Sequence, residues 1–540
     1  MYAWNLADAL DLIAELRADH DAVVQGERRL SWVQIERRAR NLAAWMKARG
    51  ATHQGKIAIY SYNHPAYMES IWAAMKAGLV PVNVNYRYRA GELRYLLENA
   101  DAELAVVHED FVPVLAEVQG ELASLRGVLV VAERGAARWL PAGAEDYESA
   151  AGSDRPAPAV ARSPDDLLLL YTGGTTGIPK GVMWRQADLY ARLGGGGLGP
   201  SPADPEALRT FVRDHPMPLR TVIGPPLMHG TGQFMALIAW LTGGAVLLLP
   251  DPRHFDAAAL WSTVERDRAN AISIVGDSFA KPMLRELRSG RRYDLTSLRM
   301  IASSGVMWSQ ETKQGLIEAH PAMALVDSLG SSEALGMGIS ITSAAGVVET
   351  ARFKLSESTR LFDPELRPIE ASPGARGLLG VSGHQPCGYY KDPAKSARTF
   401  VEAFGRRFSI PGDWAEVEGD GQTLVLLGRG SVCINTGGEK VFPEEVEEVL
   451  KLHPDVRDAV VVGVPDERFG EAVTAVVSAG AAPPDSEELV RFAKQHLAGY
   501  KAPKHVVFVD EVYRSPSGKA DFRRTREVAL EALGLSAGSR

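Results

Sequence analysis

Cysteine is scarce in this sequence, and its scarcity excludes several kinds of protein. The 540 residues include 2 cysteines, Cys387 and Cys433, which are far apart and form no C-x-x-C motif. There is no H-E-x-x-H motif, and the 12 histidines do not show the spacing of metal ligands. A structural zinc site or a zinc protease is therefore not expected. So few cysteines are typical of a reducing compartment, and we expect a cytoplasmic protein.

Long apolar runs and an excess of basic residues are also missing. No apolar run approaches the length of about 18 residues that suggests a transmembrane helix. The N-terminal segment lacks the basic region and apolar core of a signal peptide. The 59 basic residues are balanced by 67 acidic ones, which gives no sign of nucleic-acid binding. We expect a soluble protein with no nucleic-acid partner and no transmembrane segment. Peripheral contact with a membrane and assembly as a homodimer stay open.

Helical and strand patterns alternate through the first three hundred residues. The patterns predict helices at 32–49 and 66–77, and strands at 56–60, 104–107 and 127–131. This alternation favours α/β subdomains with mostly parallel sheets. The stretch 135–160 is rich in Ala, Gly and Pro, and we expect it to be an exposed connection.

The pattern changes twice in the second half of the chain. After about residue 336 the segments become short and are separated by turn residues, which favours an antiparallel, barrel-like region. From residue 441 onward, strands and helices mix in a small α+β unit. We therefore predict a large N-terminal domain, 1–428, made of two βαβ-type subdomains and a small β-barrel. A hinge at 429–432 would join it to a mobile C-terminal α+β domain, 433–540.

The most informative stretch is YTGGTTGIPKGV at 171–182, directly after the apolar run 167–170. Glycines let backbone N–H groups approach an anion closely, threonine hydroxyls can bind phosphate or Mg²⁺, and Lys180 adds positive charge. It is not a Walker A loop, because Lys180 follows Pro179 and precedes Gly181. The pattern predicts a strand followed by a loop that holds a polyphosphate. A Gly/Thr-rich surface turn is the alternative.

Three single residues could complete a nucleotide site. Glu333 follows a Gly/Ser turn and could hold Mg²⁺, or could be a solvated cap. Asp413 in PGDW could accept the hydroxyls of a ribose, or could satisfy its own turn. Lys519 in SPSGK could neutralise a developing negative charge, or could be a solvated surface residue.

Taken together and in this order, these sites resemble the AMP-forming acyl-CoA synthetases of the adenylate-forming superfamily. That superfamily also includes luciferases and the adenylation domains of peptide synthetases. The resemblance covers nearly the whole chain and includes GYYKDP at 388–393, GGEKVFPEEVE at 437–447 and GYKAPK at 499–504. GGTTG at 173–177 and GVMWRQ at 181–186 are most similar to bacterial enzymes that activate fatty acids or steroid side-chain acids.

The resemblance implies which residues surround the nucleotide. The phosphates would be held by Thr172, Gly173, Gly174, Thr175, Thr176, Gly177 and Lys180. The adenine would lie against Ser304, Gly305, Val306, Leu329, Gly330, Ser331 and Ser332. Asp413 and Arg429 would bind the ribose hydroxyls.

The resemblance also implies catalytic, metal and acyl-binding residues. Lys519, Glu333, Thr175 and Lys180 would act in catalysis, and Glu333 and Thr176 would hold the Mg²⁺ ion. The CoA pantetheine would pass Gly437 and Gly438, and Ser431 would be the hinge residue. The acyl pocket would be lined by His229, Gly230, Gly232 and Trp308. The glycines would leave room for a bulky acid, while Trp308 and Trp240 could close the pocket or could be core aromatics.

The implied reaction uses ATP, Mg²⁺ and CoA. A carboxylic acid would attack the α-phosphorus of ATP, release pyrophosphate and form an acyl-adenylate, which the CoA thiol would convert to acyl-CoA and AMP. Two half-reactions with different nucleophiles suit a mobile small domain. The alternatives are a stand-alone enzyme that loads the acyl group onto a carrier protein, and a non-catalytic acyl- or nucleotide-binding protein.

The chain departs from the pattern of this family at three positions. Gly173 stands where a serine is common, which removes one hydroxyl donor from the phosphate loop. Leu329 stands where an aromatic residue often stacks on adenine, and Ser431 stands at a hinge position that is often Asp or Lys. We therefore expect adenine to pack on an aliphatic side chain, and the hinge to act without a charged lock.

Overall fold

The computed structural model describes residues 4–535 except 134, 136, 138, 157, 173–178, 198, 216, 307, 347–350, 430–431, 437–438, 467–468, 481–482, 498 and 516–517. The chain divides into two units. The first contains Met1–Val347 and Ser382–Ser409, and the second contains Val348–Val381 and Ile410–Arg540. The domain boundary expected at residue 428 stays a prediction.

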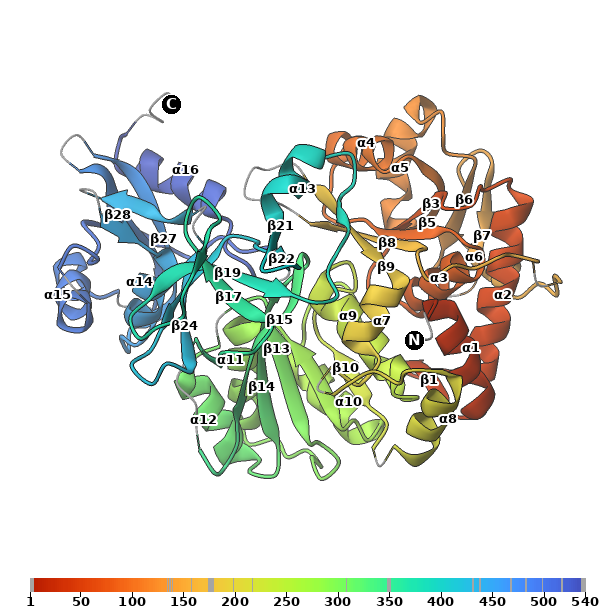
Figure 1. Ribbon diagram of the computed structural model, residues 1–540, viewed down its shortest axis with the longest axis horizontal. Helices are drawn as coiled ribbons and strands as arrows, with labels where there is room; N and C mark the ends of the chain where they lie inside the picture. The colour runs from red at the N-terminus through yellow and green to blue at the C-terminus, as the bar shows by residue number, and fades with distance from the viewer. Residues whose placement is uncertain are drawn as a thin grey trace. The chain divides into compact units, whose positions relative to one another are not determined.

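One sheet of the first unit is parallel at its centre and is buried on both faces (Figure 1). The strand order is β20-β9-β8-β4-β3-β5-β6-β7, and β9 runs antiparallel to both of its neighbours, β8 and β20. Successive side chains point to opposite faces, so Ile57 and Ile59 enter one core while Ala58 and Tyr60 enter another. The strands are β3 Lys56–Tyr60, β4 Val80–Asn83, β5 Ala102–His108, β6 Gly127–Val131, β7 Ala144–Asp146, β8 Leu167–Thr172, β9 Lys180–Arg185 and β20 Gly388–Tyr389.

The second sheet of this unit is built in the same way. Its order is β15-β14-β13-β12-β10-β11-β1-β2, with antiparallel strands only at its two edges. In β11, Val246 and Leu248 face one core and Ala245 and Leu247 face the other. The strands are β1 Asp21–Gln25, β2 Arg28–Ser31, β10 Arg220–Ile223, β11 Ala245–Leu248, β12 Ala271–Ile274, β13 Met300–Ser304, β14 Ala324–Ser331 and β15 Ala334–Thr342.

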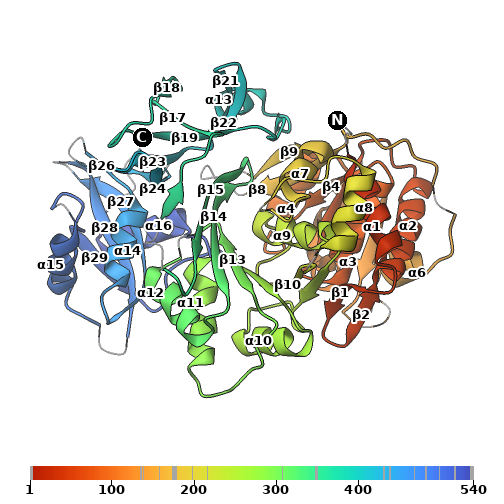
Figure 2. The same cartoon turned by 60° about the horizontal axis from the view of Figure 1, so that its bottom comes forward.

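Helices form a shared layer between these sheets and two outer layers (Figure 2). The inner layer contains α1 Leu6–Leu16, α2 Trp32–Ala48, α3 Pro65–Lys76 and α9 Gly230–Leu241. The outer layers contain α4 Ala90–Asn99 and α5 Val112–Val118 on one sheet, and α10 Ala257–Arg266, α11 Gly276–Leu287 and α12 Gln310–Ala319 on the other. The unit also contains η1 Glu109–Phe111, η2 Gln119–Glu121, α6 Tyr147–Ala151, α7 Gln186–Leu193, α8 Pro205–Asp214, α13 Pro393–Thr399, β21 Phe400–Ala403 and β22 Arg406–Ser409.

The second unit combines an antiparallel sheet with a small α+β fold. The antiparallel sheet has the order β16-β24-β23-β19-β17-β18. Its strands are β16 Arg352–Lys354, β17 Thr359–Phe362, β18 Pro368–Ile369, β19 Arg376–Ser382, β23 Asp413–Val417 and β24 Thr423–Arg429. The α+β part contains β25 Ile434–Thr436, β26 Glu439–Val441, α14 Pro443–Lys451, β27 Val456–Asp466, β28 Gly470–Ala479, α15 Ser486–His496, β29 His505–Val509 and α16 Phe522–Ala532.

The expected fold class is confirmed by this architecture: two α/β sheets, an antiparallel region and a C-terminal α+β part. Over the ranges that the structure describes, no helix has both the length and the apolar character needed to cross a membrane.

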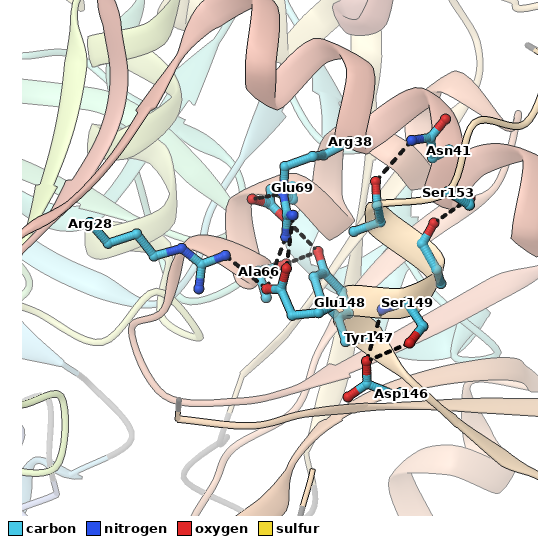
Figure 3. Close-up of polar contacts among 12 residues, drawn as sticks. Arg28, Arg38, Asn41, Ala66, Glu69, Asp146, Tyr147, Glu148, Ser149 and Ser153 are labelled. Carbon is cyan, nitrogen blue, oxygen red and sulfur yellow. Dashed lines mark hydrogen bonds and ion pairs between the residues drawn. The ribbon is translucent and has the colours of Figure 1, made fainter. Parts of the chain in front are cut away.

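The expectation of an exposed connection at 135–160 is wrong for its central part. Residues 144–151 form β7 and α6, and the side chains of Tyr147 and Ala151 are fully buried. Figure 3 shows that Tyr147 and Glu148 join a cluster of charged side chains. Arg38 on α2 pairs with Glu69 on α3 at 2.9 Å and with Glu148 at 2.8 Å, and the Tyr147 hydroxyl donates to Glu69 at 2.8 Å. The average composition of the stretch gave no indication that the side chains of Tyr147 and Glu148 anchor it.

Loss of the Glu69 charge should destabilise the first unit. The Glu69 side chain is fully buried and the Arg38 side chain is 12% exposed. In the Glu69→Gln variant, the Arg38 guanidinium would therefore lose a desolvated anionic partner. We expect the free energy of unfolding to fall by about 3 kcal/mol in chemical denaturation. Glu121→Gln is the control, because its pair with Arg94 is exposed and should contribute almost nothing. Equal losses in both variants would contradict a structural role for the buried cluster.

Candidate functional site

The Gly/Thr-rich stretch joins two paired strands. β8 ends at Thr172, β9 begins at Lys180, and these two residues are partners in the antiparallel register. Gly173, Gly174, Thr175, Thr176 and Gly177 lie outside the described residues. The two ends of the stretch, Thr172 and Lys180, therefore lie side by side at the carboxyl end of β8, which belongs to the parallel part of the sheet.

Lys180 is held at the base of this hairpin by a carboxylate. Its ammonium donates to Asp392 Oδ2 at 2.5 Å. Asp392 is also the N-cap of α13, where its Oδ1 accepts from the Lys395 N–H at 2.9 Å. The hydrogen bond from Lys180 is the main cause that lowers the pKa of Asp392 below its usual value. Asp392 is therefore an anion at neutral pH, and the two side chains form an ion pair.

Two asparagines connect the carboxyl edges of the two sheets. Asn83 ends β4; its amide accepts from Tyr171 N–H at 2.6 Å and donates to the carbonyls of Tyr171 at 2.8 Å and Met228 at 2.6 Å. Asn63 donates to the Pro225 carbonyl at 2.9 Å and accepts from the Leu227 N–H at 2.7 Å. The turn at 225–228 is thereby fixed against the end of β8.

The beginning of α9 lies in the same place. His229 is the N-cap of this helix, and its N–H donates to the Pro226 carbonyl at 3.0 Å. A Cβ atom at Gly230 would lie 3.1 Å from Leu170 Cδ2 and 3.6 Å from Ser332 Oγ. His229 and Gly230 are therefore next to both the end of β8 and the turn that precedes Glu333.

Glu333 occupies a tightly held turn between β14 and β15. Its carbonyl accepts from Ser409 Oγ at 2.7 Å, and its N–H donates to Ser331 Oγ at 3.2 Å. Its carboxylate accepts from the Tyr389 hydroxyl at 2.8 Å. Trp184 on β9 donates to the Ser332 carbonyl at 2.9 Å, so the turn is also tied to the hairpin that carries Lys180.

The proposed adenine-binding residues lie at the ends of adjacent strands. β13 ends at Ser304, which is the register partner of Ser328 on β14. Gly305 follows with φ +94°, a left-handed conformation that favours glycine. Leu329, Gly330 and Ser331 complete β14. Segments 304–306 and 329–332 are thus side by side, as the resemblance requires.

The proposed ribose-binding residues belong to the second unit. Asp413 on β23 and Arg429 on β24 are partners in the antiparallel register, and Asp413 is 9% exposed. The hinge residue Ser431 and the glycines Gly437 and Gly438 lie outside the described residues.

Lys519 is an exposed residue on a turn of the second unit. The turn is closed by a bridge between Arg514 and Ala520, and Gly518 adopts φ +76°. The Arg514 guanidinium pairs with both carboxylate oxygens of Asp458 on β27, at 2.7 and 2.8 Å, and donates to the Gly518 carbonyl at 3.1 Å. Burial raises the pKa of Asp458, but Arg514 and Lys451 outweigh it and hold that pKa below its usual value. This ion pair fixes the base of the turn that presents Lys519.

Three residues considered for the acyl pocket have packing contacts in the structure, and their part in the pocket stays a prediction. A Cβ atom at Gly232 would lie 2.4 Å from the Pro226 carbonyl oxygen, so glycine is required there by the backbone. Trp308 is fully buried in the core under α11 and α12. Trp240 donates to the Ala22 carbonyl at 2.9 Å and packs against Trp32 and Trp72. Both tryptophans are buried in the core, and closure of the acyl pocket by either stays a prediction.

Asn83, Tyr389 and Asp392 are site residues that the sequence reasoning did not assign. Tyr389 and Asp392 belong to the GYYKDP stretch, which marked the family resemblance but carried no role. Asn83 gave no signal, because its partners lie 88 and 145 residues away in the chain.

Comparison with known proteins points to one family. Residues 10–390 match the model of the family described as AMP-binding enzyme, and residues 445–519 match that of the AMP-binding enzyme C-terminal domain. A medium/long-chain-fatty-acid–CoA/3-oxocholest-4-en-26-oate–CoA ligase of Mycobacterium tuberculosis (strain ATCC 25618 / H37Rv) is 40% identical over 533 residues, 97% of this chain and 96% of that protein. A 3-oxocholest-4-en-26-oate–CoA ligase of Rhodococcus rhodochrous is 40% identical over 541 residues, with 97% and 96% coverage.

A solved structure has the same fold. The anthranilate CoA ligase AuaEII in complex with anthranoyl-AMP is similar with a TM-score of 0.82 at 22% identity, and the match covers 99% of this chain and 98% of that one.

The backbone requirement at Gly232 can be separated from a role in the pocket. Gly232→Ala should lower the free energy of unfolding by about 2 kcal/mol, because the new methyl group meets a main-chain carbonyl. Gly230→Ala should cost less, because its first neighbour is the movable end of the Leu170 side chain. Urea denaturation measures both. An unchanged stability for Gly232→Ala, together with an altered preference among acids, would show that Gly232 lines the acyl pocket and is not required by the backbone.

Proposed function

The chain belongs to the AMP-binding enzyme family and is an acid–thiol ligase, and we propose that it joins a carboxylic acid to CoA through an acyl-adenylate. The overall reaction converts the acid, ATP and CoA into acyl-CoA, AMP and pyrophosphate. The observation that carries the proposal is the full-length similarity to curated CoA ligases. It is supported by the convergence of Lys180, Glu333 and the start of α9 at the carboxyl edge of two sheets.

The acid is proposed to be a medium- or long-chain fatty acid or a steroid side-chain acid. The two curated ligases described above carry these substrates in their names. The acyl group would lie along the segment that begins at His229, next to the end of β8.

Attack of one anion on another needs positive charge around the phosphates. Lys180 supplies it at the hairpin, and Lys519 supplies it on the turn of the second unit. Glu333 offers a hard oxygen ligand of the kind that suits Mg²⁺, which is often held by one carboxylate together with substrate phosphates. When bound, Mg²⁺ would shield the phosphate charge, and Thr176 would be a further ligand. Thr175 and the backbone of the 172–177 stretch would hold phosphate oxygens.

The remaining nucleotide contacts follow from the strand ends. Adenine would lie between 304–306 and 329–332, with the aliphatic side chain of Leu329 in place of an aromatic one. Asp413 would accept hydrogen bonds from the ribose hydroxyls with Arg429 beside it, as their register allows. Gly437 and Gly438 would line the path of the CoA pantetheine.

We also propose a cytoplasmic location.

Lys519 should be required for one half-reaction only. Lys519→Ala should abolish acyl-AMP formation, because the positive charge that Lys519 brings to the α-phosphate is lost. The variant should largely retain thioester formation from supplied acyl-AMP, which needs the second arrangement of the domains. Radiolabelled acid and synthetic acyl-AMP measure the two steps. Lys494→Ala, an exposed lysine on α15, is the control and should change neither step. Equal loss of both steps in Lys519→Ala would refute domain alternation.

The acid and the acceptor can be identified in one assay. We expect pyrophosphate release with medium- and long-chain fatty acids or steroid side-chain acids, and turnover to acyl-CoA only when CoA is present. If acyl-AMP forms but CoA never accepts the acyl group, the enzyme loads a carrier protein. If no acid gives pyrophosphate, the chain only binds its ligands.

A further inference from the structure

We propose that Tyr389 and Asp392 are positioning residues that hold two opposite charges of the nucleotide site, the Glu333 carboxylate and the Lys180 ammonium. This inference rests on the proposed function, because it assigns Glu333 to the metal and Lys180 to the phosphates. Both positioning residues come from one short segment, Gly388 to Pro393.

This segment is fastened to the strand that carries Lys180. β20 pairs with β9 through Gly388 with Met183 and Tyr389 with Val182. Next to this pairing, Cys387 N–H donates to the Met183 carbonyl at 2.7 Å and Tyr390 N–H donates to the Gly181 carbonyl at 2.8 Å. The segment and the phosphate-binding hairpin therefore share one backbone frame.

Ser396 fixes the shape of the segment from inside. The Tyr389 N–H donates to Ser396 Oγ at 2.8 Å, and Ser396 Oγ donates to the Asp392 carbonyl at 2.7 Å. Lys391 between them adopts φ +55°, an uncommon conformation for a residue with a side chain. The segment is a defined turn that sends Tyr389 toward Glu333 and Asp392 toward Lys180.

Tyr389 sets the direction of the Glu333 carboxylate. Tyr389 is 4% exposed, and its hydroxyl donates to Glu333 Oε1 at 2.8 Å. The main chain of Glu333 is already fixed by Ser409 and Ser331, so the hydroxyl restricts the remaining freedom of the side chain. A carboxylate has two oxygens, and a hydrogen bond to one of them orients the other for a cation.

Asp392 sets the position of the Lys180 ammonium. The ion pair has one hydrogen bond of 2.5 Å, whereas an ammonium carries three N–H donors. Lys180 can therefore remain bound to Asp392 while it donates to a phosphate oxygen. A flexible lysine loses much conformational freedom when it is ordered, and Asp392 removes that cost before the nucleotide arrives.

Conservative substitutions separate these roles from simple packing. Tyr389→Phe removes the hydroxyl and keeps the ring. Asp392→Asn removes the charge and keeps a side chain that caps a helix equally well. Tyr390→Phe is the matched control, because it removes a hydroxyl from the adjacent tyrosine, whose partner is the exposed Asp101.

Two measurements test the proposal on the full-length chain. The first is binding of Mn²⁺, followed by electron paramagnetic resonance in the presence of a non-hydrolysable ATP analogue. The second is pyrophosphate release as a function of Mg²⁺ and of ATP, with melting temperatures recorded in parallel. Tyr389→Phe should weaken Mn²⁺ binding and raise the half-saturating Mg²⁺ concentration about threefold to tenfold. Asp392→Asn should raise the KM for ATP by a similar factor, with the KM for the acid unchanged in both variants.

The outcomes distinguish this inference from the proposed function. If the wild-type chain releases no pyrophosphate with any acid, the proposed function fails. If the wild type is active and both variants match Tyr390→Phe in metal binding and in KM for ATP, the inference is overturned. If Tyr389→Phe lowers the melting temperature strongly, Asp392→Asn decides, because it leaves the hydrogen bond from the Tyr389 hydroxyl to Glu333 in place.

Discussion

The docking of the two sheet edges is the constraint on which the rest of the site depends. Asn83 and Asn63 stand at the carboxyl ends of strands in one sheet and bind the turn at 225–228, which leads from the other sheet into α9. Asn83 also binds both main-chain groups of Tyr171, just before the Gly/Thr-rich stretch. The bonds of Asn83 are buried and made to backbone, so loss of one would leave a buried polar group unpaired. The hairpin of β8 and β9 and the start of α9 are thus held against each other by amide groups.

The charged residues of the site are held by neighbours before any ligand is present. Glu333 is bound by Tyr389, Lys180 by Asp392, and the turn of Lys519 by the pair of Arg514 with Asp458. Charges fixed in advance cost no reorganisation when the reaction takes place. The lysine on the small unit differs from the other two residues, because it is exposed on its turn.

Much of the fold could be predicted from the sequence, because it follows from local patterns. The strand at Lys56–Tyr60 and the helix from Trp32 have the expected bounds within one residue, and the family and the enzyme class implied by the motifs are confirmed. The prediction of an exposed connection at 135–160 was wrong because it rested on the Ala/Gly/Pro-rich average composition. It gave no weight to Tyr147 and Glu148, the two residues that anchor the stretch. The partners of Asn83 and Lys180 could not be predicted, since Asp392 lies 212 residues from Lys180. The close approach of Gly232 to the Pro226 carbonyl could not be predicted either, because it depends on the fold of the turn.

The central claim is that the carboxylate of the acid attacks the α-phosphorus of ATP. It is tested most directly with an acid labelled with ¹⁸O in both carboxylate oxygens, followed by mass spectrometry of the nucleotide after turnover with CoA. The account predicts AMP with one ¹⁸O atom, because one carboxylate oxygen forms the bond to phosphorus and stays there when the thiol takes the acyl group. Unlabelled AMP, with the ¹⁸O in inorganic phosphate or pyrophosphate, would contradict it.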